Sequence, residues 1–164
     1  MTIIEPAEER LWQDVVEAHH AFSSALRELF SKANDPIQII KRELLGPQRT
    51  TALYIVKSLD LKGIRDCVRE LVFLSSFAHG GIDTARAALL RLPREYLVGN
   101  IPAISEQILQ SGTWDEYRRM LELYETFDMD LTLRLARRAA RNADPDIREA
   151  GMDFLTKLGA SIDE

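Results

Sequence analysis

The chain has 164 residues, of which 46% are hydrophobic and 29% charged, which suits a single globular core with a well-solvated exterior. Its net charge of −5 disfavours non-specific binding to nucleic acid or to an anionic membrane, because the mean field repels phosphate. The single cysteine, Cys67, excludes an intramolecular disulfide and a cysteine-based metal cage, and its apolar neighbours predict a buried thiol.

No targeting or membrane segment is evident in the sequence. The acidic N-terminus lacks the basic-then-apolar pattern of a signal peptide, and the longest uncharged stretch, residues 71–82, is too short to cross a bilayer. We therefore expect a cytoplasmic protein that does not contact membranes.

A long helix is predicted from about Pro6 to Ala33, where apolar residues recur at steps of four and three in a heptad-like seam. The seam consists of Leu11, Val15, Ala18, Phe22, Ala25 and Leu29. Four further residues, Trp12, Val16, Leu26 and Phe30, widen it into a broad apolar stripe. The helix should therefore pack along other helices or join a partner, and it is a candidate surface for forming a homo-oligomer.

A short helix should follow, from Pro36 to about Leu45. Asp35 supplies an N-cap and Pro36 suits the first helical position, while Gly46-Pro47 ends the helix.

A helical phrase then recurs at intervals of about thirty residues. Its copies are Arg49–Leu59, Asp83–Leu92, Asp115–Phe127 and Asp146–Leu158, with offsets of 34, 32 and 31 between their first residues. A period in this range is typical of stacked helical pairs, none of which can bury its apolar side alone. Each copy is therefore predicted to be the first helix of an antiparallel pair.

The second helices of the pairs are predicted at Leu61–Phe77, roughly Glu95–Gln110 and Met129–Asn142. Pro102, close to Gly99 and Asn100, predicts a break or kink in the middle one, because proline cannot donate its backbone hydrogen bond. No segment alternates with the period of a strand, so the predicted fold class is all-α. In the third pair, Tyr117, Tyr124 and Phe127 are expected in the core, whereas Trp114 is a candidate anchor for a partner.

Residues 144–159 (DPDIREAGMDFLTKLG) resemble the first helix of a HEAT repeat in their cap, Asp-x-x-Arg start, small Ala150 and leucine spacing. The other copies match more loosely, and the resemblance extends over about residues 47–159. It implies a short right-handed α-solenoid of repeats in 47–164, with the helices of 1–46 packed on it as part of one domain. It also implies a non-catalytic scaffold or adaptor that binds another protein through its concave face.

Basic residues form two rows on the predicted second helices. Arg134, Arg137, Arg138 and Arg141 share one face at i, i+3, i+4 and i+7, and Lys62, Arg65 and Arg69 form a similar row in the first pair. Guanidinium groups bind carboxylates and phosphates bidentately. The rows are therefore the predicted partner-binding residues, for a protein with an acidic surface. The alternatives are a merely solvated face and binding of a nucleic-acid backbone, the second disfavoured by the net charge.

Catalytic patterns are absent from the sequence. Glu17 and His20 have the Glu-x-x-His spacing of a di-iron helix bundle, and His19 is adjacent to them. Such a site needs a second Glu-x-x-His on another helix, and the sequence contains none. There is no nucleophile elbow, and Gly80-Gly81 lacks the lysine of a phosphate loop. We therefore expect no enzyme, metal or cofactor. HEAT-like alkylpurine DNA glycosylases remain a less favoured alternative, since none of their catalytic pattern transfers to this chain.

Overall fold

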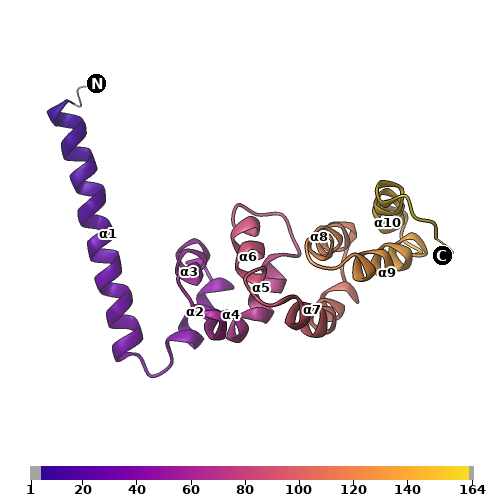
Figure 1. Ribbon diagram of the computed structural model, residues 1–164, viewed down its shortest axis with the longest axis horizontal. Coiled ribbons are helices and arrows are strands. Elements are labelled where there is room, and N and C mark those ends of the chain that lie inside the picture. The colour runs from indigo at the N-terminus through magenta and orange to yellow at the C-terminus, as the bar shows by residue number, and fades with distance from the viewer. Residues whose placement is uncertain (1–4, 163–164) are drawn as a thin grey trace. The chain divides into compact units, whose positions relative to one another are not determined.

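The computed structural model describes residues 5–162, and the regular structure in this part of the chain is entirely α-helical (Figure 1). The helices are α1 (Pro6–Lys32), α2 (Pro36–Leu44), α3 (Arg49–Val56), α4 (Leu61–Asp66), α5 (Val68–Leu74), α6 (Ile82–Leu89), α7 (Arg94–Leu109), α8 (Trp114–Glu125), α9 (Met129–Ala140) and α10 (Pro145–Leu158). The predicted all-α class is therefore confirmed. Contacts divide the chain into two units, Met1–Ile39 and Ile40–Glu164, which are described separately.

The long helix of the first unit agrees with its prediction to within one residue. Helix α1 starts at Pro6 behind a capping box, in which the backbone N–H of Glu5 donates to Glu8 Oε2 over 3.1 Å. None of its residues is buried, and Leu11 and Val15 are 66% and 56% exposed. The apolar seam read from the sequence thus lies on a helix that no other described helix of its own unit packs along over its length.

Helix α2 begins and ends as the sequence predicts. Asp35 caps it, because its Oδ1 accepts a hydrogen bond of 3.0 Å from the backbone N–H of Gln38. The helix crosses the division between the units, and its last turn belongs to the second one. There Ile40 and Leu44 are buried, so this turn is part of the core of residues 40–164.

The four copies of the repeated phrase form helices α3, α6, α8 and α10, as predicted. A capping box begins α8, since the N–H of Thr113 donates to Glu116 Oε2 over 2.8 Å. Asp144 caps α10 by accepting from two backbone N–H groups. Gly159 ends α10 at a φ of 63°, a left-handed conformation that favours glycine.

The first of the second helices was predicted as one continuous helix, Leu61–Phe77, and this prediction is wrong. Two helices, α4 and α5, lie there instead. Cys67 has a ψ of 6° and separates them, while Ile64 and Leu71 on either side are buried. Neither glycine nor proline marks this break, so packing sets it. Helix α5 also ends early, because the hydroxyls of Ser75 and Ser76 donate to backbone carbonyls of the last turn.

Of the break or kink predicted in the middle second helix, the break does not occur. Helix α7 runs without interruption from Arg94 to Leu109 with Pro102 inside it. Its buried residues lie four apart, at Leu97, Ile101, Ser105 and Leu109, so one continuous face packs into the core. Burial of that face outweighs the single backbone hydrogen bond that Pro102 cannot donate. The third second helix, α9, forms close to its predicted range.

Within residues 40–164, helices that are not adjacent in the sequence contact one another (Figure 1). Helix α3 contacts α6, α5 contacts α7, and α8 contacts α10. Side-chain pairs join different helices at separations of 36 residues for Arg86 with Glu122, 35 for Arg118 with Asp153 and 32 for Arg138 with Glu106. The separation of 32 equals one offset of the sequence phrase, and the other two exceed the offset between the copies that they join by four residues, about one helical turn.

The last two helices approach each other most closely at Gly151. A Cβ atom built on Gly151 would lie 2.3 Å from the backbone nitrogen of Ala140 and 2.7 Å from the carbonyl oxygen of Ala136. No real Cβ atom sits that close to a backbone atom, so only glycine lets α10 approach α9 in this way. The close approach explains why small residues, Ala136, Ala139 and Ala140, occupy the facing side of α9.

Candidate functional site

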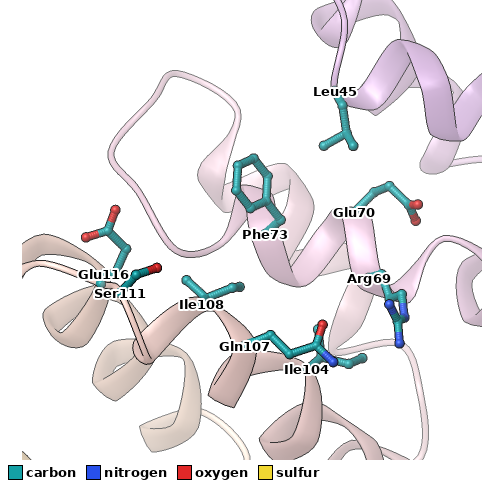
Figure 2. Close-up of a pocket in the computed structure, with 10 residues that line it drawn as sticks. Leu45, Arg69, Glu70, Phe73, Ile104, Gln107, Ile108, Ser111 and Glu116 are labelled. Atoms are coloured by element: carbon teal, nitrogen blue, oxygen red, sulfur yellow. The ribbon is translucent and has the colours of Figure 1, made fainter.

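An open pocket of about 460 Å³ lies in the second unit and is lined by residues of α5, α7, the start of α8 and Leu45. We call it the α5–α7 groove; its lining residues are Leu45, Arg69, Glu70, Phe73, Ile104, Gln107, Ile108, Ser111, Gly112 and Glu116. In the view of Figure 2, Phe73 and Ile108 occupy its middle, with Arg69 and Glu70 toward one end. Its volume is within the usual range for pockets that hold a small molecule or a side chain.

The middle of the groove is apolar and accessible. Phe73 is 45% exposed and Leu45 is 51% exposed, whereas Ile104 and Ile108 are half-buried. Ile104 and Ile108 are four residues apart and therefore lie on the same face of α7. Phe73 is supported from behind by an edge-to-face contact with Phe77, at 5.3 Å between ring centroids. The groove is thus a preformed apolar surface that a partner side chain can enter.

One carboxylate at the groove has an unsatisfied oxygen. Glu70 Oε1 lies 3.7 Å from Lys41 Nζ, and the side chain of Glu70 is only 13% exposed. Its second oxygen, Oε2, is buried and has no hydrogen-bond partner among the described residues. Buried polar atoms are nearly always satisfied, and leaving one unsatisfied costs about 1–3 kcal/mol. Glu70, a lining residue of the groove, therefore keeps one buried acceptor without a partner.

The other end of the groove is shaped by Glu116. Burial alone would raise the pKa of this carboxyl, but hydrogen bonds from the side chain and backbone of Thr113 outweigh burial and lower the pKa. Glu116 is therefore an anion that is already satisfied within the cap of α8. Its role at the groove is to make that end negative and fixed in position.

The predicted arginine row on α9 is on one face, as its spacing indicates, but three of its members already have partners. Arg138 forms an ion pair with Glu106 of α7 and lies 5.8 Å from the Tyr117 ring centroid. Arg137 and Arg141 donate to the backbone carbonyls of Ser161 and Ile162, at 3.1 and 2.7 Å. Arg134 is exposed. The row therefore contributes to holding the end of the chain against α9.

The second predicted row is divided by the break at Cys67. Lys62 and Arg65 lie on α4, where Lys62 is exposed and the Arg65 guanidinium lies 5.0 Å from the Tyr96 ring centroid. Arg69 lies on α5 and lines the groove. Of the seven predicted partner-binding residues, the structure brings Arg69 alone to this pocket.

A second pocket, of about 590 Å³, is larger but less suited to a ligand. Its charged residues are committed to the fold, since Arg49 donates to the carbonyl of Leu44 and lies over the Phe77 ring. The ring of His79 is held at both nitrogens: Nδ1 accepts from the N–H of Gly81, so Nε2 carries the proton and donates to the carbonyl of Leu74 over 2.7 Å. We therefore base the functional argument on the α5–α7 groove.

Within residues 5–162, no three or more histidine, cysteine, aspartate or glutamate side chains are arranged to hold a metal ion. This holds also for Glu17, His19 and His20 and the residues around them. In the same part of the chain, no helix combines the length and hydrophobicity needed to span a bilayer.

Cys67 is buried, as predicted, and is expected to be inert. Burial, followed by the negative charge of Glu70, raises the pKa of its thiol from 9.0 to about 12. We expect no reaction of native protein with a disulfide reagent such as dithionitrobenzoate at about pH 8, and one thiol per chain after unfolding in urea. Rapid labelling of the native protein would contradict this assignment.

The same shift predicts how stability depends on pH. The unfolded thiol ionises near pH 9.0 and the folded one near pH 12, so the unfolded chain releases its proton first. The free energy of unfolding should therefore fall as the pH rises through this window. Cys67→Ala provides the control, because it removes this contribution to the pH dependence.

Sequence reasoning missed the groove, because its walls come from separate helices. Glu70 and Phe73 appear in the sequence as parts of an ordinary amphipathic helix, and Ile104 and Ile108 as core positions next to a proline. The only usable signal was that Phe73 lies off the buried face of α5, which is formed by Val68, Leu71, Val72 and Leu74.

Comparison of the chain with protein-family profiles, with curated proteins and with solved structures finds no match. Any functional conclusion must therefore come from the chain's own residues and geometry.

Proposed function

We propose that residues 40–164 form a short HEAT-like α-solenoid that acts as a scaffold or adaptor, docking a segment of a partner protein in the α5–α7 groove. The repeat arrangement is supported by the ion pairs between consecutive repeats, whose separations of 32 to 36 residues nearly match the sequence period. Stacked repeats of this kind expose extended surfaces that recognise other proteins.

The single observation that carries the docking proposal is the combination found in the groove. An accessible phenylalanine, Phe73, lines the same open pocket as Glu70, whose buried Oε2 has no hydrogen-bond partner among the described residues. A large apolar side chain placed against Phe73 and Ile108 would lose contact with water, which is the main favourable term in protein association. A nitrogen donor beside it would satisfy Glu70 once the Glu70 side chain turned its buried Oε2 toward the pocket. The preferred segment therefore has a large apolar residue next to a lysine, arginine or other N–H donor.

Selection from a random peptide display library on the full chain tests this function. We expect enriched peptides with a large apolar residue beside a lysine or arginine, and we expect Phe73→Glu to weaken their binding by about tenfold or more, since an anchor residue is worth at least 1.4 kcal/mol. The matched control is Met152→Glu on α10, because Met152 is 41% exposed, close to the exposure of Phe73, and lies outside the groove.

Both variants should keep the helical circular dichroism spectrum, since each replaced side chain is exposed. Absence of any enriched peptide, or binding that Phe73→Glu and Met152→Glu reduce equally, would contradict docking in the groove.

A further inference from the structure

The apolar seam of α1 could pack against the same seam of a second, antiparallel copy of the helix. In heptad notation, Val15 is at position a and Leu11 at position d. The same a and d positions continue beyond the apolar seam to Glu8 at one end and Lys32 at the other, about three and a half heptads in all. In an antiparallel pair of coiled helices, each a position faces a d position of the other helix. The facing pairs between two copies would be Glu8 with Lys32, Leu11 with Leu29, Val15 with Ala25, and Ala18 with Phe22.

We propose that α1 pairs with α1 of a second copy of this chain, in an antiparallel coiled coil centred between Ala18 and Phe22. A twofold interface requires that residue i contacts j while j contacts i, and the pairs above meet that condition at every seam position. Large side chains face small ones in the middle, which is how packed layers fill space without gaps. At the two ends, a glutamate faces a lysine.

The charge distribution of the helix favours the antiparallel orientation. Residues 5–17 carry five acids and one base, whereas residues 18–32 carry one acid and two bases. A parallel pair would place the two acidic halves side by side, and an antiparallel pair places each acidic half beside the weakly basic half of the other copy. The antiparallel helix dipoles favour the same orientation.

The flanks of the seam are compatible with this pairing. On one flank, Trp12, which is 61% exposed, would face Leu26 of the second copy and extend the apolar contact. On the other flank, Asp14 would face Glu28; this like-charge pair is exposed, so solvent and salt reduce its cost. The polar face of α1 carries more acids than bases, which disfavours an anionic membrane surface as the alternative cover for the stripe.

Sedimentation equilibrium of the full chain tests the pairing. We expect a dimer for the wild type and a dissociation constant raised by about a hundredfold or more for Val15→Glu, because each dimer buries two copies of this residue. His20→Glu is the matched control, since His20 is exposed and points away from the seam. It should dimerise as the wild type does. A monomeric wild type, or a Val15→Glu variant that dimerises equally well, would overturn the proposal.

Disulfide trapping tests the orientation. Leu11→Cys and Leu29→Cys are made as separate variants, mixed and mildly oxidised. Antiparallel pairing predicts a mixed disulfide between positions 11 and 29 as the main product, whereas disulfides joining position 11 to 11 and 29 to 29 would overturn it. Cys67 does not interfere, because it is buried. The result is independent of the groove, since the residues tested all lie on α1.

Discussion

Replacing Gly151 by alanine is expected to destabilise the protein by about 2–3 kcal/mol, the net of an overpacking cost and a gain in helix propensity. The added Cβ would lie 2.3 Å from the backbone nitrogen of Ala140, so the clash is with a backbone and cannot be relieved by rotating a side chain. Helices α9 and α10 would have to separate, which opens the packing around Ala136 and Phe154. Urea unfolding followed by circular dichroism measures the change.

Gly99→Ala is the matched control, because it makes the same substitution in the interior of another helix. No atom lies within 4 Å of a Cβ built on Gly99, and the residue is exposed. This variant should gain about 0.5–1 kcal/mol from the better helix propensity of alanine. The two substitutions are thus expected to differ in sign. A Gly151→Ala variant as stable as the wild type would contradict the close approach of α9 and α10.

Asp128→Ala is expected to cost about 2–3 kcal/mol, since it removes an N-cap and a buried acceptor together. Asp128 is 7% exposed; its Oδ1 accepts from the N–H of Leu131 over 2.8 Å, and its Oδ2 pairs with Arg94 at the start of α7. The residue therefore both starts α9 and connects it to the start of α7. The free energy of unfolding in urea again provides the measurement.

Asp128→Asn separates the two contributions. Asparagine is an equally good N-cap, so this variant keeps the cap of α9 and loses only the charge that faces Arg94. Because Arg94 is 63% exposed and can return to water, the loss should be about 1 kcal/mol. Equal destabilisation by alanine and asparagine would show that the cap contributes nothing, against the geometry at Leu131.

The local features of the fold were predictable, because short-range chemistry determines them. The capping residues Asp35, Thr113 and Asp144 and the glycine after α10 place helix ends to within a residue or two. The two errors in the second helices have a common cause. At Cys67 the helix is interrupted although no glycine or proline is present there. At Pro102 the helix continues although proline usually interrupts one. In both places the packing of buried neighbouring residues determines the backbone conformation.

The candidate site was less predictable than the helices. The spacing of Arg134, Arg137 and Arg138 correctly indicates one helix face, but it carries no information about what that face meets. Glu106, the partner of Arg138, lies 32 residues earlier, on α7. The groove has the same origin, since Phe73 and Ile108 come together only when α5 and α7 pack. Contacts between repeats must be known before a surface can be assigned.

The most direct test of the docking groove is to titrate an enriched peptide into nitrogen-15-labelled protein and record the amide chemical shifts. The groove predicts that the largest changes fall on α5 and α7, around Glu70, Phe73 and Ile108, and that Met152 and its neighbours on α10 are unaffected. Changes that cluster instead on α9 around Arg134 and Arg137 would contradict the groove and assign binding to the arginine face.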